Sequence, residues 1–323
     1  MPAVAAVALM VTLAMSGCGA SGEAAVENGL TVVKVVKPSA ASDNLALTLA
    51  INQGTFKKHG LKVTLVSAPQ VGSNQIASLL NGQLDVGIGA VTSLMTAVTK
   101  GVPVRVVSAV AADNEQGGRP LYDTLVAPDS GIKSFKDLVG RTVAVNSLKS
   151  TWQASMSEAI TKDGGDPAKV KYVPLTFPNQ VPALKNGHVD AISTTQPFAT
   201  QLIEQGFRSI GDAQAKALND PHGVATIIQM SQAFIDKNPD AVAKFVTALQ
   251  EGSDFANANP TAVRELAVEQ AGASGDAAAA ITASPLPLYT TKIDAKTIET
   301  WGALQTKYGF DKRAPSPSDV LWK

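Results

Sequence analysis

A helix that stops at Asn-Gly and leads into an alternating, strand-like run occurs twice in this chain of 323 residues. The first copy reads LLNGQLDVGIG and contains Gly82 and Asp85, and the second reads ALKNGHVDAIS and contains Gly187 and Asp190. Glycine often ends a helix because it adopts the left-handed conformation without a steric penalty. We therefore expect Gly82 and Gly187 to end two helices, and the two aspartates to cap or orient the connection to the next strand.

The segments around both copies repeat one order of elements: strand, polar loop, helix, strand, polar loop, helix, Asn-Gly, strand. β-Branched and alternating apolar runs predict the strands, which are residues 30–36, 61–66, 84–88, 141–145, 170–173 and 188–193. The predicted helices are residues 45–59, 72–81, 151–162 and a short helix capped by Asn179. Two open α/β units in one chain predict two lobes, each with a mostly parallel sheet covered by helices.

Other segments complete the predicted domain organisation. A polar, Gly-rich stretch at 112–120 is typical of a crossover between lobes. Helices expected at 240–256, 261–271 and 295–308 have no counterpart in the second copy, and the simplest arrangement returns them to the first lobe. The predicted parts are a signal peptide at 1–17, a flexible tether at 18–29, lobe 1 at 30–117 plus 213–323, and lobe 2 at 118–212.

Composition excludes several classes of protein. Lys plus Arg and Asp plus Glu both number 27, so no surplus of positive charge points to nucleic acid. Hydrophobic residues make up 45% of the chain, which is typical of a globular protein with a core. The single cysteine excludes an internal disulfide framework and a cysteine-based metal cluster. We expect neither a cofactor nor a metal site.

The one cysteine lies in an informative place near the start. The apolar run from Ala3 to Met15 is shorter than the ~20 residues that a membrane-spanning helix needs, and it is typical of an export signal. With Cys18 following Ser16 and Gly17, the segment resembles a bacterial lipobox, although no Lys or Arg precedes it and Met15 replaces the usual Leu. This predicts an exported protein, periplasmic or anchored to the outer face of the cell membrane through lipidated Cys18. The alternative is a buried cysteine in an N-terminal helix.

Six segments, in order along the chain, carry a family resemblance: NLALTLAINQGTFKKHGLKVTLV, NGQLDVGIGAVTSLM, GVPVRVVSAV, SFKDLVGRTVAVNSLKST, NGHVDAISTTQPF and FIDKNPDAVAKFVTAL. Together they resemble solute-binding proteins of ABC importers, from the nitrate/sulfonate/taurine group that also includes thiamine-precursor binders (SsuA/THI5-like). The resemblance implies an α/β, type II periplasmic-binding-protein-like fold whose two lobes close on a small molecule. It also implies an ABC permease and its ATPase as partners.

Ligands of such sheets bind beyond the carboxyl ends of the strands, where loops meet helix N-termini. Unpaired N–H groups there suit anions, and hydroxyls add hydrogen bonds, although Ser, Thr and Asn are also ordinary helix caps. The first lobe contributes the candidates Ser42, Asp43, Gly72, Ser73, Asn74, Thr92 and Ser93. The second lobe contributes Ser147, Lys149, Ser150, Thr151, Trp152, Asn179, Thr194, Thr195, Gln196 and Phe198.

Two charged candidates indicate different ligands. Lys149 beside Ser150 and Thr151 favours a sulfonate, carboxylate or phosphate, whereas Asp43 favours an amine. If both face the cleft, a zwitterion fits better than nitrate; each alone is more often a solvated surface charge. Trp152 and Phe198 either stack on a flat ligand or pack in the core. The predicted solute is therefore small, organic, and anionic or zwitterionic.

An enzyme of the same bilobal fold is the main rival. Its chemistry would need a nucleophile, a base or a cysteine–histidine arrangement, and the chain offers three scattered histidines, at positions 59, 188 and 222. A transcription regulator would need a helix-turn-helix or basic segment before the first strand. We expect a monomeric solute receptor without catalytic activity. A thiamine-precursor (pyrimidine) binder, an enzyme of this fold, and a sensor that signals to a kinase stay open as alternatives.

Overall fold

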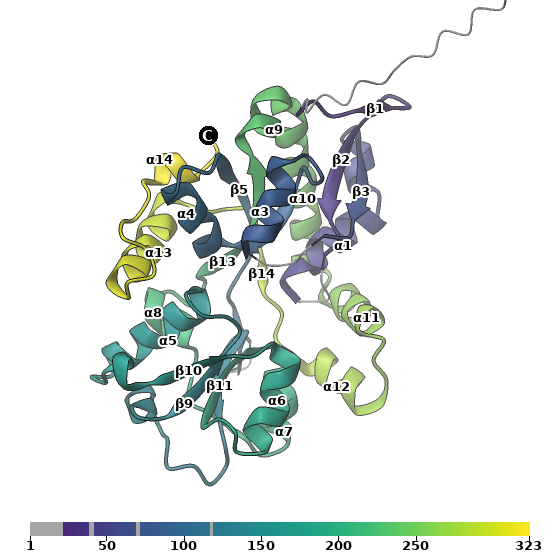
Figure 1. The fold of residues 1–323 in the computed structure, drawn as a ribbon. Coiled ribbons are helices and arrows are strands. Elements are labelled where there is room, and N and C mark those ends of the chain that lie inside the picture. Colours follow the sequence, from purple (N-terminus) through teal and green to yellow (C-terminus); the bar gives the residue numbers. More distant parts are fainter. Residues whose placement is uncertain (1–21, 39–41, 69–71, 117–118) are drawn as a thin grey trace, which may run out of the picture.

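The computed structural model describes residues 22–38, 42–68, 72–116 and 119–323, and its elements form two lobes, one above the other in Figure 1. Cys18 and the predicted signal peptide lie outside the described residues, so lipidation stays a prediction. Among the described residues, no helix has both the length and the apolar character that crossing a membrane requires.

The upper lobe contains a sheet with the order β14-β5-β13-β4, next to the smaller sheet β1-β2-β3. Its strands are β1 (Val26–Glu27), β2 (Leu30–Val36), β3 (Leu61–Val66), β4 (Gly87–Ala90), β5 (Val104–Ala112), β13 (Val224–Ser231) and β14 (Leu288–Tyr289). β2 and β3 are parallel, and a parallel bridge between Val35 and Val86 links this pair to the start of β4. The core strands therefore follow the order β3-β2-β4-β13-β5.

The lower lobe contains a sheet with the order β10-β9-β11-β8-β12. Its strands are β8 (Tyr122–Val126), β9 (Thr142–Val145), β10 (Lys171–Pro174), β11 (Ala191–Thr195) and β12 (Arg208–Ser209). Each strand of this order has a counterpart in the upper lobe, with β9, β10 and β11 in the places of β2, β3 and β4. The repeat in the sequence thus corresponds to a repeat in topology.

The prediction of mostly parallel sheets is wrong in one respect. β8 runs antiparallel to β11 and β12, and β13 runs antiparallel to β4 and β5, so both sheets are mixed. The reason lies in the route of the chain. β8 and β13 are the strands that follow a crossing from the other lobe, and they enter their new sheet from the cleft edge, where the parallel strands end.

The two Asn-Gly units have the structure that the sequence predicts. Gly82 and Gly187 adopt left-handed φ angles of 72° and 68° at the ends of their helices. Asp85 Oδ2 accepts the backbone N–H of Lys34 at 2.8 Å, and Asp190 Oδ2 accepts that of Thr142, also at 2.8 Å. Both aspartates therefore orient the connection by binding the first strand of their lobe.

Replacing the two aspartates is expected to have unequal effects on stability. Asp85 is buried, whereas Asp190 is half-buried, so water can replace the lost acceptor more easily at Thr142 than at Lys34. Asp85→Ala is expected to lower the free energy of unfolding by about 1–3 kcal/mol, the cost of an unpaired buried N–H. Asp190→Ala is expected to cost clearly less in the same urea titration; equal losses would contradict the burial argument.

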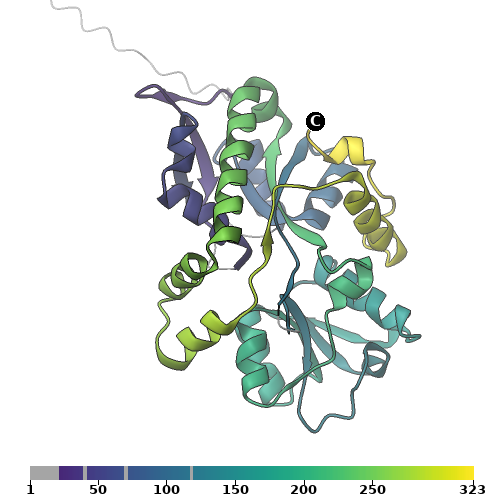
Figure 2. The same ribbon diagram turned by 180° about the vertical axis from the view of Figure 1, so that it is seen from behind.

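Helices cover both sheets (Figure 1). Those of the upper lobe are α1 (Leu45–Asn52), α2 (Thr55–Lys58), α3 (Gly72–Leu80), α4 (Val91–Thr99), α9 (Gln232–Lys237), α10 (Pro239–Ala258), α11 (Pro260–Ala271), α13 (Ala295–Lys307) and α14 (Pro317–Val320). Those of the lower lobe are α5 (Thr151–Lys162), α6 (Phe177–Lys185), α7 (Phe198–Glu204) and α8 (Ala213–Leu218). α12 (Gly275–Ala283) follows α11 and packs against α7, so this part of the chain reaches from one lobe to the other (Figure 2).

Three predicted elements differ from the structure. The expected helix at 45–59 is two helices, because Gly54 has a left-handed φ of 71° between α1 and α2. The third strand begins at Gly87 rather than Leu84, since the preceding residues make a single bridge. Helix α6 begins at Phe177 after Thr176, and Asn179 lies inside it rather than at its cap.

Two long-range contacts hold the upper lobe together. Trp301 of α13 is fully buried, and its indole Nε1–H donates to the carbonyl oxygen of Val224, the first residue of β13, at 2.8 Å. Near the end of the printed sequence, Leu321 forms a parallel bridge with Val106 of β5, and the N–H of Trp322 donates to the Val106 carbonyl at 2.8 Å. The upper sheet is therefore completed by residues far apart in sequence.

Two crossing segments connect the lobes and lie side by side; their described residues are 113–116 and 119–121 in the first and 219–223 in the second. The N–H of Asp113 donates to the Gly223 carbonyl at 3.1 Å, and His222 Nδ1 lies 3.0 Å from the Asp113 carbonyl oxygen. A second inter-lobe contact lies between α5 and α13, where Lys307 Nζ and the Tyr308 hydroxyl both donate to Glu158 Oε2 at 2.6 Å. The lobes thus meet at the crossings and at this polar contact.

Candidate ligand-binding cleft

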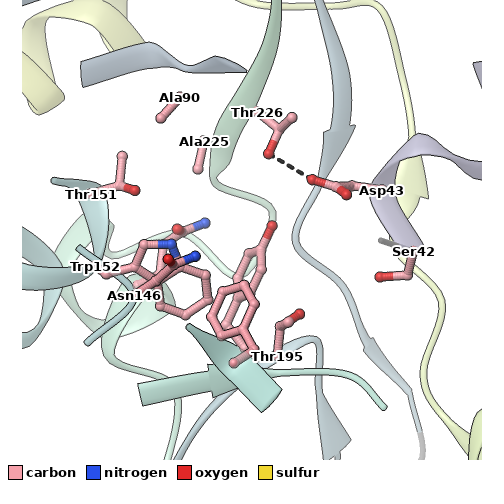
Figure 3. Close-up of a pocket in the computed structure, with 12 residues that line it drawn as sticks. Ser42, Asp43, Ala90, Asn146, Thr151, Trp152, Thr195, Ala225 and Thr226 are labelled. Carbon is pink, nitrogen blue, oxygen red and sulfur yellow. Dashed lines mark hydrogen bonds between the residues drawn. The ribbon is translucent and has the colours of Figure 1, made fainter. Parts of the chain in front are cut away.

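A cavity of about 160 Å³ lies between the lobes, and Figure 3 shows the 12 residues that line it. This is smaller than the ~300–1,000 Å³ typical of pockets for drug-sized ligands, so the cavity suits a small solute. The upper lobe contributes Ser42, Asp43, Ala90, Ala225 and Thr226. The lower lobe contributes Tyr122, Asn146, Thr151, Trp152, Phe177, Thr195 and Gln214.

Asp43 is the charged group of the upper wall. It lies in the short 3-10 helix η1 (Ser42–Asn44) that precedes α1, and the Thr226 hydroxyl donates to its Oδ2 at 2.7 Å (Figure 3). Burial raises the pKa of the Asp43 carboxyl, and the hydrogen bond from Thr226 opposes that shift in part. Among the described residues that line the cavity, Asp43 is the one acid, and there is no Lys or Arg.

Aromatic side chains form the lower wall. Tyr122 and Trp152 meet edge to face with ring centroids 5.1 Å apart, and Trp152 and Phe177 do so at 5.0 Å. Phe198 extends the series by stacking on Phe177 at 6.4 Å. Burial raises the pKa of the Tyr122 hydroxyl well above its usual range, and the nearby charges of Asp43 and other aspartates add to the shift. Tyr122 therefore stays a neutral hydrogen-bonding group at ordinary pH.

Three helices begin at the cavity. α4 follows Ala90, α5 begins at Thr151 and α6 begins at Phe177, all of which line it. In the described structure, none of the three capping side chains accepts a hydrogen bond from the first turn of its helix; the Ser150 hydroxyl instead donates to the Ser147 carbonyl at 2.6 Å. Free N–H groups and the positive ends of helix dipoles favour acceptor atoms of a ligand at these positions.

Five of the predicted ligand-binding residues line the cavity: Ser42, Asp43, Thr151, Trp152 and Thr195. Figure 3 shows Ser42 and Asp43 on the side opposite Thr151 and Trp152, as expected for residues from two lobes. Two further predicted residues lie beside the lining: Phe198 stacks on the lining residue Phe177, and Ser150 directly precedes Thr151. The sequence-based selection of strand-end loops therefore identified part of both walls.

Other predicted residues lie elsewhere. Lys149 is exposed, with a left-handed φ of 51°, and its backbone N–H donates to Gln153 Oε1 at 2.7 Å. Thr92 is buried in α4, where its carbonyl accepts from Gln305, and Gln196 is held by Pro120 and Thr200. Ser93 is half-buried in α4, and Thr194 is buried in β11. The exposed candidates are Ser147, Asn74 and Asn179. Helix α3 begins with Gly72 and Ser73, and the Ser73 side chain lies outside the described part of the structure.

Three of the seven lining residues that the sequence analysis missed come from the antiparallel strands. Tyr122 begins β8, and Ala225 and Thr226 lie near the start of β13. The rule for carboxyl ends applies to parallel strands, whereas an antiparallel strand presents its first residues at that same edge. Asn146 directly follows β9, so its position did carry a signal. Gln214, in α8, had none.

A pair of buried carboxyl groups lies near the cavity, between the first crossing and the start of α8. Asp113 follows β5 and Asp212 precedes α8; the two groups influence each other's pKa, and among the described residues each has one buried oxygen, Oδ2, without a hydrogen-bond partner. Asp212 Oδ1 also accepts the N–H groups of Gln214 and Ala215, at 2.6 and 3.0 Å. Burial and the neighbouring carboxyl raise the pKa of Asp113, and burial raises that of Asp212. Two neighbouring buried carboxyls with raised pKa values favour a proton held by the pair, and this is a prediction that the pH dependence of stability tests.

Asp123 of β8 adds a third carboxyl near the crossings. Its Oδ1 accepts the Ser209 hydroxyl at 2.6 Å and the N–H of Thr124 at 2.8 Å. Burial raises the pKa of Asp123 to about 7. In the described part of the chain, no group of three His, Cys, Asp or Glu residues is arranged to hold a metal ion.

Comparisons with known proteins find relatives of two kinds, a binding protein and a synthase. A protein from Brachyspira hyodysenteriae, provisionally named an ABC transporter periplasmic binding protein, is 26% identical over 281 residues, which cover 81% of this chain and 75% of that protein. The 4-amino-5-hydroxymethyl-2-methylpyrimidine phosphate synthase of Schizosaccharomyces pombe is 23% identical over 221 residues. That match covers 65% of this chain and spans only 61% of the synthase.

The solved structure of the periplasmic aliphatic sulphonate binding protein SsuA from Escherichia coli matches with a TM-score of 0.71 at 17% identity, covering 90% of this chain and 92% of that one. This likeness confirms the predicted α/β, periplasmic-binding-protein-like fold. The model of the family described as NMT1/THI5 like matches residues 42–263, more than half of the chain. The chain therefore belongs to the NMT1/THI5-like family.

Proposed function

We propose that this chain is an exported solute-binding protein that captures a small organic molecule between its lobes and delivers it to an ABC permease and its ATPase. The observation that carries the proposal is the inter-lobe cavity, whose walls come from both lobes. A solute in that position contacts both walls at once and so favours one arrangement of the lobes over others. The Brachyspira relative supports the transport role, and a lipid anchor at Cys18 remains part of the proposal.

The cavity favours a flat solute with a hydrogen-bond donor at one end and acceptors at the other. Asp43 suits an amine or amino group, the rings of Trp152 and Phe177 suit a planar or apolar body, and the helix starts suit acceptor atoms. Because Lys149 lies outside the lining, a simple anion such as nitrate has no cationic partner there. A zwitterion or a polar nitrogen heterocycle fits this arrangement best.

A pyrimidine-forming enzyme is the second candidate, and the matches to the pyrimidine phosphate synthases favour it. Such chemistry needs a nucleophile or a base that titrates near neutral pH. Among the described residues lining the cavity there is no His, Cys or Lys, Tyr122 is held neutral, and the Asp43 carboxyl, whose pKa burial raises, is the one group that could act as a base. Binding without turnover is therefore the function that this cavity supports better.

The proposal is tested with the full chain purified without denaturation. Native mass spectrometry reports any solute that is carried over, and thermal unfolding is then followed with taurine, nitrate and 4-amino-5-hydroxymethyl-2-methylpyrimidine. A solute present at 100 times its dissociation constant adds about 2.7 kcal/mol to stability, which raises the melting temperature by several degrees. We expect a shift with the aminopyrimidine or taurine and none with nitrate. Turnover of a bound compound would instead support the enzyme.

Asp43→Asn is expected to weaken the binding of an amine-bearing solute about 10-fold to 100-fold. The substitution keeps an oxygen for Thr226 but removes the charge, and a hydrogen bond to a charged group contributes about 1.5–3 kcal/mol. Lys149→Ala is the matched control, because the exposed Lys149 side chain lies outside the cavity lining. Isothermal titration calorimetry measures both. Equal weakening by the two variants would contradict the placement of Asp43 as the main charged contact.

A further inference from the structure

A second, smaller cavity lies next to the first. It holds about 50 Å³ and also has walls from both lobes: Leu45 of α1, Ala267 and Ala271 of α11, Ile281 of α12, and Pro197 before α7. Ala267 and Ala271 are four residues apart and so lie on one face of α11. The small side chains at these two positions leave the space that the cavity occupies.

Two polar side chains of this second cavity, Gln196 and Ser284, are already hydrogen-bonded within the protein. Gln196 donates from Nε2 to the Pro120 carbonyl at 3.0 Å, and its Oε1 accepts the Thr200 hydroxyl at 2.8 Å. The Ser284 hydroxyl donates to the Ala280 carbonyl at 2.7 Å. The remaining lining is mostly aliphatic, so a group that enters this space gains by leaving water rather than by new polar contacts.

The two cavities share a wall. Ser42 lines both, and Gln196 of the second directly follows Thr195 of the first. The Tyr289 hydroxyl donates to the Ser42 carbonyl at 2.8 Å, which fixes the backbone at the shared position. The two spaces are therefore adjacent at Ser42.

We propose that the second cavity is a subsite for a short alkyl substituent of the solute, whose flat polar end occupies the first cavity. The solute class is then an amphiphilic nitrogen compound: a polar ring or zwitterionic end that carries a chain of a few carbons. This inference rests on the proposed binding function and adds to the proposed solute an alkyl part that lies outside the first cavity.

The test uses 4-aminopyrimidines that carry a 2-methyl, 2-ethyl, 2-propyl or 2-butyl group, titrated calorimetrically into the full chain. Affinity is expected to rise about fourfold for each methylene that reaches the apolar space. The rise should stop after the first two or three carbons, because the space is small. A flat series in which the methyl compound binds would overturn the subsite and leave the proposed function intact. If no member of the series binds, the proposed ligand chemistry fails and the subsite fails with it.

Variants of α11 provide the second arm. Ala267→Leu fills the subsite, so it should abolish the gain from methyl to propyl while the methyl compound keeps its wild-type affinity. Ala271→Leu, at a more exposed position, is expected to act in the same direction and serves if Ala267→Leu does not fold. Glu269→Leu adds an apolar side chain to an exposed position of the same helix and is expected to leave the gain unchanged. An undiminished gain in both alanine variants would overturn the proposal.

Discussion

Asp212→Asn is expected to flatten the dependence of unfolding free energy on pH between pH 5 and pH 8. In the wild type, Asp212 and Asp113 are neighbouring buried carboxyls, and burial raises the pKa of each, which favours a proton held by the pair. Asparagine keeps the oxygen that accepts from Gln214 and Ala215, and its amide donates to Asp113 without a titrating proton. The fold is retained while the proton uptake is removed.

The sign follows from proton linkage. The ordinary pKa of aspartate is about 3.9, so above pH 4 the folded pair binds more protons than the unfolded chain, and stability falls as pH rises. A difference of one full proton corresponds to about 1.4 kcal/mol per pH unit. The variant should lose up to that slope, and so become more stable relative to wild type toward alkaline pH. Burial raises the pKa of Asp123 to about 7, and the charge of Asp212 adds to this shift, so the variant should also lower the slope from Asp123 slightly.

Urea titrations at several pH values measure this effect. Asp220→Asn is the matched control, because Asp220 lies exposed in the crossing that follows α8, where its Oδ1 accepts the N–H of His222 at 2.9 Å. We expect its slope to equal that of the wild type. Asp212→Ala removes the helix cap as well and should be less stable at every pH. A wild-type slope in Asp212→Asn would show that the pair shares no proton.

Trp301→Ala is expected to lower the free energy of unfolding by about 3–5 kcal/mol, the usual cost of emptying a fully buried aromatic site. The loss has two parts: the apolar contacts of the ring, and the hydrogen bond from Nε1 to the Val224 carbonyl. Val224 begins β13, which two residues later contributes Thr226 to the cavity. The variant should therefore also weaken solute binding.

Trp301→Phe separates the two parts. Phenylalanine keeps most of the packing but leaves the Val224 carbonyl without its donor, so the expected loss is about 1–3 kcal/mol. Trp322→Ala, at a half-buried position, should cost less than Trp301→Ala. Far-ultraviolet circular dichroism in urea compares the three variants without depending on tryptophan emission. An equal loss for Trp322→Ala would contradict the central place of Trp301 in the core.

The order of helices and strands in both lobes could be predicted from the sequence, because local patterns and their order along the chain are sufficient for it. Gly82 and Gly187 end helices, and Asp85 and Asp190 bind the first strands, as a repeat of short-range patterns predicts. Strand direction was harder, since no local pattern distinguishes a strand that has crossed from another lobe. β13 reads as an ordinary apolar strand, and its antiparallel course follows from where the chain comes from.

The same reason explains the mixed result at the cavity. Asp43, Thr151 and Trp152 follow or precede elements whose direction was predicted correctly, and they line the cavity. Thr226 and Tyr122 lie near the beginning of strands, whereas the rule for carboxyl ends selects residues that follow a strand. The prediction that Lys149 faces the cleft was wrong for a different reason. One residue separates Lys149 from Thr151, but its left-handed backbone conformation leaves its side chain exposed.

The bridge from Val106 to Leu321 has a consequence for the order in which the molecule can assemble during synthesis. All five strands of the lower sheet and the helices that cover it come from residues 122–218, so every pairing partner within this lobe is present once that stretch has left the ribosome. β5 of the upper lobe is made earlier but must wait for residues 321 and 322 before its pairing is complete. During synthesis, the complete lower lobe therefore lies between two segments of an upper lobe whose strand pairing is still incomplete.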